Sequence, residues 1–244
     1  MNISLYQAAA ALNANANWQD VISENLAAGS VPGFKKSDVV FSTIQAAQGQ
    51  GGLLPTTQVV TNFEQGQLRP TNVPTDVAIE GDGFFEVQLP SGQMAYTRDG
   101  EFQFNALGQL VTKQGYTVQT DSGPIQIDLK TPGPISIAPD GTVSQGSNLL
   151  GKLALTTFNN PQLLTQIGNS YFAAKNPSLV SSPATTNTTL VRQGYLEGSN
   201  VSPVAEMAHM ITAMRQYEAS QRVLQMHDDR MNHAINDLGN PNPV

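Results

Sequence analysis

The residue types best suited to metal binding or acid–base chemistry are three histidines, His209, His227 and His233, all near the C-terminus. They fall within one predicted helix, and no two of them are four residues apart, the spacing that lets two imidazoles on one helix share a zinc ion. His227 is followed directly by Asp228 and Asp229, and consecutive side chains on a helix point in different directions. We therefore interpret these histidines as solvated polar groups of the helix rather than metal ligands.

Glycines and carboxylates in the middle of the chain suggest two further chemistries. Residues 81–85, Gly-Asp-Gly-Phe-Phe, do not follow the phosphate-loop pattern and lie within sequence rich in hairpin signals, so they predict a turn. Asp99, Glu101 and Asp140 could act as the paired carboxylates of a glycoside hydrolase if the fold brought them together. However, Asp99 and Asp140 each precede a glycine, a pair typical of tight turns.

Nucleophilic catalysis has even less support in the sequence. The chain has no cysteine, which excludes disulfides, thiol nucleophiles and cysteine-ligated metals. It also lacks the Gly-x-Ser-x-Gly pattern of a nucleophile elbow. We predict a protein that is not an enzyme, with no catalytic, cofactor-binding or metal-binding residues and no small-molecule substrate. A secreted β-domain enzyme acting on carbohydrate is kept as an alternative.

Charge and hydropathy exclude several kinds of partner. The 244 residues carry a net charge of -7 and no basic stripe, which argues against nucleic-acid binding. No apolar run approaches the ~20 residues of a membrane-spanning helix. The first lysine is Lys35, so the N-terminus lacks the positive region of a signal peptide. We expect no direct membrane insertion and export without a cleaved signal peptide.

The low content of charged residues suits a protein that packs against its own copies. Charged residues make up 13% of the chain, against ~25% in an average globular protein. Such a surface repels identical copies weakly. The same composition would suit a free-standing secreted adhesin, which remains a second alternative.

The N-terminal segment predicts a helix with one heptad-like face. Apolar and small residues recur at alternating steps of three and four, and two polar residues share the pattern. The positions are Leu5, Ala8, Leu12, Asn15, Gln19, Ile22 and Leu26. Gly29 and Pro32 are expected to end the helix.

The C-terminal segment predicts a longer helix of the same kind. Ser202 and Pro203 form a capping and first-turn pair, and Gly239 and Pro241 end the pattern. The periodic positions are Met207, Met210, Met214, Tyr217, Gln221, Leu224, Asp228, Met231, Ile235 and Leu238. A straight helix over 203–238 would be roughly 54 Å long at ~1.5 Å per residue. We expect neither terminal helix to have a partner within the monomer, so that both ends become ordered on assembly.

The middle of the chain predicts a β domain. Short strand-like runs alternate with Asp-Gly, Ser-Gly and Leu-Gly turns. The predicted strands are 77–80, 84–89, 93–98, 101–104, 109–112, 116–119, 125–129, 135–138 and 152–158. Segments 45–55 and 176–189 have linker composition.

These elements give a mainly β fold with terminal α-helices. We predict an N-terminal helix and turn over 1–35, an extended linker or arm over 36–75, a central all-β domain over 76–196 and a C-terminal helix over 197–244. The polar positions of the two helices either face water or fix the register of a helix–helix contact, and the sequence leaves both readings open.

Several motifs in this order resemble the flagellar rod and hook proteins. That family's N-terminal signature is similar to Asn-Leu-Ala-Asn-x-x-Thr-x-Gly-Phe-Lys, and the chain departs from it at Ala28 and Val31. The matching residues are Asn25, Leu26, Ala27, Gly33, Phe34 and Lys35. Segments 76–85, 96–100, 108–112 and 194–201 are similar to further family motifs. Within the family the chain most resembles the proximal-rod proteins, with the distal-rod proteins a close second.

The resemblance implies a structural role in the periplasmic rod of the flagellar basal body. Family members are exported through the flagellar type III apparatus. Their terminal helices pair into a coiled-coil-like inner domain that lines a tube, and their β domains form an outer layer. The implied partners are other copies of the chain and neighbouring rod proteins, and a hook-type axial subunit is the alternative. The implied assembly interface comprises Leu5, Leu12, Ile22, Leu26, Met207, Met210, Met214, Tyr217, Leu224, Met231, Ile235 and Leu238.

Overall fold

The computed structural model describes residues 3–45, 53–128, 133–168, 170–174, 181–183 and 189–239. The chain forms two compact units. The first comprises Met1–Ala27, Ser37–Thr61 and Ser202–Val244, and the second comprises Ala28–Lys36 and Asn62–Val201. The prediction of a mainly β chain with terminal helices is confirmed.

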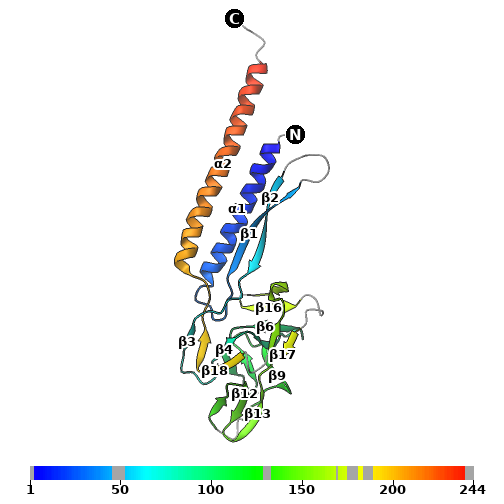
Figure 1. Cartoon of the computed structure of the whole chain (residues 1–244), viewed down its shortest axis with the longest axis vertical. Helices are drawn as coiled ribbons and strands as arrows, with labels where there is room; N and C mark the ends of the chain where they lie inside the picture. The colour runs from blue at the N-terminus through cyan, green and yellow to red at the C-terminus, as the bar shows by residue number, and fades with distance from the viewer. Residues whose placement is uncertain are drawn as a thin grey trace. The chain divides into compact units, whose positions relative to one another are not determined.

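The first unit combines two helices with a β-hairpin (Figure 1). Helix α1 spans Ile3–Ala27, and helix α2 spans Pro203–Gly239 and carries Glu206 in its first turn, where the helix dipole favours a carboxylate. Strands β1 (Ser37–Gln45) and β2 (Leu53–Thr61) pair antiparallel in continuous register and pack against α1. Much of segment 36–75, which we predicted to be an extended arm, therefore belongs to this hairpin.

The two helices lie side by side within one chain, so the expectation that neither has an intramolecular partner is wrong. They run antiparallel, because Asn25 contacts Glu206 near the start of α2 while Asn15 lies 3.5 Å from Ser220 farther along it. Small buried side chains such as Ala213 allow this close approach. A heptad pattern shows that a helix needs a partner, but it does not show whether that partner belongs to the same chain.

The second unit is built from short strands. Its largest sheet has ten strands, with the path β15-β16-β6-β5-β9-β8-β7 and β10, β14 and β17 attached to it. The bounds are β5 Phe84–Gln88, β6 Met94–Thr97, β7 Phe102–Phe104, β8 Leu110–Thr112, β9 Thr117–Thr120, β10 Gly123–Pro124, β14 Leu155–Phe158, β15 Leu164–Gln166, β16 Tyr171–Ala174 and β17 Ser181–Pro183. A three-residue 3-10 helix, η1 (Pro161–Leu163), precedes β15.

Three smaller sheets complete the second unit. The first is three-stranded, with β11 (Ile135–Ile137), β12 (Thr142–Gln145) and β13 (Asn148–Lys152). The others pair β4 (Val77–Gly81) with β18 (Thr189–Gln193), and β3 (Leu68–Pro70) with β19 (Tyr195–Glu197). All of these pairings are antiparallel. Short turns join β11 to β12 and β12 to β13, whereas the other two sheets pair strands that are far apart in the chain.

Three hydrophobic clusters are described in the second unit, and two of them meet at β5. The larger contains Phe85, Val87 and residues from several other strands, and the smaller packs Phe84 against Leu164 and Phe172. Neighbouring residues of β5 thus enter different clusters, because successive side chains of a strand point to opposite faces. Both faces of β5 are therefore covered.

One predicted strand of the second unit differs from the structure, and two predicted linkers fall largely outside the described residues. The predicted strand 125–129 is not formed as such over its described part. Ile125 is buried, and its segment meets β8 through single backbone bonds such as that from the Leu110 N–H. The predicted linkers 45–55 and 176–189 lie largely outside the described residues.

Candidate functional site

The family-like signature places a lysine in the interior of the second unit. The Lys35 side chain is 1% exposed, and its Nζ donates to Glu197 at 2.6 Å and to the Glu64 carbonyl at 2.7 Å. Arg98 donates to the other Glu197 oxygen at 3.1 Å, and Glu197 itself is fully buried. One carboxylate thus holds two cations. We call Lys35, Arg98 and Glu197 the buried ion cluster.

Gly33 and Phe34 bring Lys35 to this position. Gly33 has φ +67° and donates its N–H to the Glu197 carbonyl at 2.8 Å. Phe34 is buried against Ala28 and Val201. The turn therefore uses a glycine for its left-handed backbone and an aromatic anchor for its packing, and Lys35 is directed inward as a result.

Desolvation dominates the electrostatics of the cluster. Burial lowers the pKa of Lys35, and the negative charge of Glu197 acts in the opposite direction. Burial likewise lowers the pKa of Arg98, again opposed by Glu197. The negative charge of Glu197 therefore offsets part of the cost of burying both cations.

Sequence reasoning did not pair these three residues. It singled out Lys35, and it placed Arg98 and Glu197 in two separate motifs, 96–100 and 194–201. The available signal was that three motifs far apart in the chain each contained at least one charged residue. Charge alone could not show that they meet, because most charged residues are exposed.

Asn200 ties together the segments beside this cluster. Its Oδ1 accepts the Lys36 N–H at 2.7 Å, and its Nδ2 donates to the carbonyls of Asn62 at 2.9 Å and Glu64 at 3.1 Å. The Asn62 N–H also donates to the Lys36 carbonyl at 2.7 Å. One side chain thus fixes the end of the signature turn against the segment that follows the hairpin.

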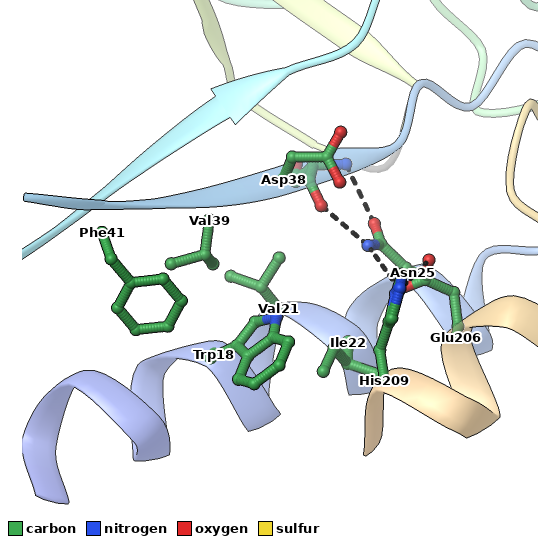
Figure 2. A pocket seen from close by; sticks show the side chains of 10 residues that line it. Trp18, Val21, Ile22, Asn25, Asp38, Val39, Phe41, Glu206 and His209 are labelled. Carbon is green, nitrogen blue, oxygen red and sulfur yellow. Dashed lines mark hydrogen bonds and ion pairs between the residues drawn. The ribbon is translucent and has the colours of Figure 1, made fainter. Parts of the chain in front are cut away.

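Asn25, the first signature residue, has a different role within the first unit. Its side chain accepts the Ser37 N–H at 3.0 Å and donates to the Ser37 carbonyl at 2.8 Å, and it also donates to Glu206 at 3.3 Å (Figure 2). It is 1% exposed. A side chain that satisfies both backbone groups of another residue mimics a strand partner, so Asn25 joins α1 to the start of β1.

A small cavity lies beside Asn25, with a volume of about 180 Å³ (Figure 2). One side is apolar and includes Trp18 and Phe41, whose rings meet edge to face at 5.6 Å. The other end is polar and includes Asn25, Glu206 and His209. The lining consists of Trp18, Val21, Ile22, Asn25, Ser37, Asp38, Val39, Phe41, Glu206 and His209. The carboxylates and the histidine do not form a metal-binding group, and no cluster of that kind occurs among the described residues.

The predicted assembly residues fall into two groups in the structure. Leu12, Ile22, Leu26, Met210, Tyr217 and Leu224 are buried or half-buried. Met207, Met214, Met231 and Ile235 are exposed, while the side chains of Leu5 and Leu238 lie outside the described residues. Their role in assembly remains a prediction.

The other sequence candidates take part in local contacts. His209 lies 3.4 Å from Glu206 within α2. Asp140 accepts from the Thr142 backbone and hydroxyl, and Glu101 pairs with Lys113 at 3.3 Å. No helix in the described parts of the chain has a stretch long and apolar enough to cross a membrane.

Asp99 is a buried turn residue with an unusual titration. Burial raises its pKa to about 6, although its carboxylate accepts the Glu101 N–H at 3.0 Å. A raised pKa means that folding favours the protonated form. The stability contributed by this group is therefore complete below pH 3.8 and is lost as the pH rises through about 6.

We expect Asp99→Asn to stabilise the protein at pH 8, by up to roughly 3 kcal/mol, and to have little effect at pH 4. The amide cannot ionise, and its oxygen can still accept the turn hydrogen bond. Urea unfolding at both pH values measures the difference. Asp140→Asn is the control, because the pKa of that exposed aspartate is lowered by its bonds to Thr142. An equal gain from both substitutions would contradict the burial argument.

Two family models match this chain. A family model described as the flagellar hook protein FlgE/F/G D1 domain matches residues 78–145, and one described as the flagellar basal body rod FlgEFG protein C-terminal matches residues 192–237. The flagellar basal-body rod protein FlgG of Borreliella burgdorferi is 35% identical over 96% of this chain and 97% of that protein.

Two relatives named FlgF match to a similar degree. The flagellar basal-body rod protein FlgF of Caulobacter vibrioides is 34% identical over 91% of this chain and 92% of that protein. That of Escherichia coli is 32% identical over 96% and 97%. The chain therefore belongs to the flagellar basal-body rod protein family.

Proposed function

We propose that this chain is a structural subunit of the flagellar basal-body rod. It polymerises through its terminal helices into the tubular drive shaft that transmits torque across the periplasm. Its partners are other copies of itself and neighbouring rod proteins. Catalysis has no part in this role.

A stripe of exposed apolar residues on α2 carries the proposal. Val204, Met207, Ile211 and Met214 are 79%, 57%, 55% and 52% exposed. Steps of three, four and three residues put them on one side of the helix. This apolar stripe is separate from the face that contacts α1, where Met210 and Ala213 are covered.

Association is the simplest physical use for such a stripe. Each exposed side chain would gain stability on leaving water, at ~25 cal/mol per Å² of apolar area. One helix stripe buries too little area to offset the cost of ordering two molecules. A subunit with several neighbours buries many such contacts at once, which suits a polymer.

Ile211→Glu tests this function. We expect the thermal unfolding midpoint to stay near that of the native chain because Ile211 is exposed, and we expect the variant to fail to restore swimming in bacteria that lack the native gene. A buried unpaired carboxylate would cost several kcal/mol at each subunit contact. Swimming at the native level would overturn the proposal.

Two controls separate charge from position. Ile211→Met keeps the stripe apolar and should support swimming. Leu107→Glu makes the same kind of exposed apolar-to-acid change in a turn of the second unit, where Leu107 is 67% exposed, and it should also swim.

We place the subunit in the proximal rod, as the sequence motifs favour. The distal rod is the second candidate, favoured by relatives named FlgG at 34–36% identity. Complementation of strains lacking either protein distinguishes the two positions. Rescue of the distal-rod deletion alone would reverse our assignment.

A further inference from the structure

The cavity beside Asn25 is built by three elements of the first unit that each turn one face toward it (Figure 2). Helix α1 contributes Trp18 and, one and two turns farther on, Ile22 and Asn25, which therefore lie on the same side of the helix. Strand β1 contributes alternate residues such as Val39 and Phe41, which share one face of the strand. The start of α2 closes the polar end.

That polar end contains a buried carboxylate. Glu206 is 1% exposed. One of its oxygens accepts a hydrogen bond from Asn25 at 3.3 Å, and the other lies 3.3–3.5 Å away from no cation but 3.4 Å from the imidazole of His209, which is charged only when protonated. The dipole of α2 stabilises part of the negative charge. A buried carboxylate is further stabilised by a neighbouring cation, so this end of the cavity favours positive charge.

The chain itself supplies no permanent cation to the cavity. Among the described residues, the lining includes Asp38 and Glu206 and no lysine or arginine. Segments 1–27, 37–61 and 202–244 contain no lysine, and their three arginines, at positions 215, 222 and 230, do not line it. A cation beside Glu206 would therefore come from outside the first unit.

The opposite end suits the apolar part of such a ligand. Trp18 meets Phe41 edge to face at 5.6 Å and lies 6.4 Å from the ring of His209 on its other side (Figure 2). Aromatic rings pack against alkyl chains and also attract cations over their faces. No group of side chains suited to a metal ion occurs among the described residues, so the arrangement favours an organic cation.

The cavity is large enough for a small ligand, and solvent can reach it. Its volume is about 180 Å³, and a cavity of ~150 Å³ in another protein holds benzene. The side chains of Phe41 and His209 are 47% and 48% exposed. They form the accessible edge, whereas Glu206 lies at the buried end.

We propose that this cavity binds a short primary alkylammonium group, with the ammonium beside Glu206 and the alkyl chain against Trp18 and Phe41. Small amines and the end of a lysine side chain from another protein share this chemistry. A bound group would contact α1, β1 and α2 together, so it would stabilise their arrangement. The inference concerns the single chain, and its test does not depend on the proposed function.

Trp18 provides the measurement, because it lines the cavity and is the single tryptophan of the chain. The purified full chain is titrated with n-butylammonium chloride at constant ionic strength, and Trp18 fluorescence is recorded. n-Butanol is the matched probe without charge. The thermal unfolding midpoint gives a second readout, since a ligand that binds only the folded chain raises it.

We expect saturable binding of n-butylammonium in the millimolar range, because so small a ligand makes few contacts, and much weaker binding of n-butanol. Glu206→Gln should weaken n-butylammonium binding roughly tenfold or more, since it removes a charged hydrogen-bond acceptor. Glu218→Gln makes the same change at an exposed position of α2 outside the lining, and it should bind as the native chain does.

Phe41→Leu keeps the test decisive if Glu206→Gln disturbs the helices, which far-ultraviolet circular dichroism would reveal. Phe41 is exposed, so this variant should fold, and loss of its ring should weaken binding about two- to fivefold. The inference is overturned if n-butylammonium gives no saturable change, if n-butanol binds equally well, or if the folded variants at positions 41 and 206 bind as the native chain does.

A capped lysine, N-acetyl-lysine methylamide, distinguishes the two sources of the ligand. Binding as tight as that of n-butylammonium would identify a lysine side chain of another protein as an occupant that fits. Failure of the capped lysine, with n-butylammonium still bound, would restrict the site to small free amines. Either result supports the site, because both require the ammonium to be recognised beside Glu206.

Discussion

Replacing Glu197 with glutamine should lower the free energy of unfolding by about 3–5 kcal/mol, the cost of breaking a buried ion pair by removing one partner. Glu197 is fully buried and accepts hydrogen bonds from Lys35 at 2.6 Å, from the Gly66 N–H at 2.9 Å and from Arg98 at 3.1 Å. Glutamine has nearly the same shape, so little packing is lost. It leaves two buried cations beside a neutral amide whose NH2 group is itself a donor.

Glu80→Gln is the matched control for this substitution. Glu80 pairs with Arg192 in the same unit, but both side chains are exposed, at 41% and 48%. Solvent screens exposed charges and can replace the lost partner, so we expect a much smaller change. Equal destabilisation by the two substitutions would show that burial of the ion cluster is not the cause.

The positions of the aromatic residues allow urea unfolding of the second unit, which contains Glu197, to be followed apart from that of the first. The single tryptophan, Trp18, lies in the first unit, whereas Tyr96, Tyr116 and Tyr171 lie in the second. Tyr195 also lies in the second unit, while Tyr6 and Tyr217 lie in the first. With four of the six tyrosines, the unit that contains Glu197 makes the larger contribution to their near-ultraviolet circular dichroism during urea unfolding. Trp18 fluorescence follows the helical unit in the same sample.

A second substitution tests whether charge is the cause. Adding Lys35→Met to Glu197→Gln removes one of the two buried cations that have lost their carboxylate partner, and it keeps most of the side-chain volume. We expect this double variant to recover part of the lost stability, because the first substitution leaves Lys35 uncompensated. A loss equal to the sum of the two single losses would indicate independent packing effects.

The sequence was sufficient for the parts of the fold that follow from local periodicity. Steps of three and four predicted both helices, and short runs between turn dipeptides predicted eight of the seventeen strands described in the second unit, β4–β9, β11 and β14. The Asp140-Gly141 pair shows why, since Gly141 has φ +88° and the Asp140 carboxylate caps the turn through Thr142. These signals depend on neighbouring residues only.

Contacts between distant segments could not be predicted in the same way. The periodicity of α2 gave Met207 and Met210 equal weight, yet Met210 is half-buried while Met207 is 57% exposed. Adjacent apolar positions compete for the same contact, and the choice depends on where α1 approaches. The hairpin of β1 and β2 was missed for a related reason, because it depends on pairing between residues 37–45 and 53–61, which periodicity within either strand does not reveal.

The resemblance to rod proteins identified residues without explaining them. Asn25, Gly33 and Lys35 belong to one short signature, but they perform three different tasks. Asn25 bonds to both backbone groups of Ser37, Gly33 provides a left-handed turn, and Lys35 joins the buried ion cluster. Spacing in the sequence alone could not separate these roles, since each depends on a partner elsewhere in the chain.

Gly33→Ala should destabilise the second unit well beyond the ordinary cost of a left-handed alanine, which is about 1–2 kcal/mol. A Cβ at this position would lie 2.3 Å from the Asp99 nitrogen and 2.4 Å from the Arg98 carbonyl carbon. These are backbone atoms and cannot rotate away, so the turn that places Phe34 and Lys35 must shift.

Gly92→Ala separates the close approach from the backbone strain. Gly92 has φ +84°, and an added Cβ there would meet nothing within 4 Å. It should therefore show the conformational cost alone, and the difference between the two urea unfolding midpoints measures the clash. If Gly33→Ala were no more destabilising than Gly92→Ala, the turn would have room to move, and the position of Lys35 would be fixed by its ion pair rather than by the glycine.

Combining Gly33→Ala with Glu197→Gln tests whether the turn or the ion pair positions Lys35. If the turn positions Lys35, the double variant should lose less stability than the sum of the single losses, because a shifted turn has already weakened the contact between Lys35 and Glu197.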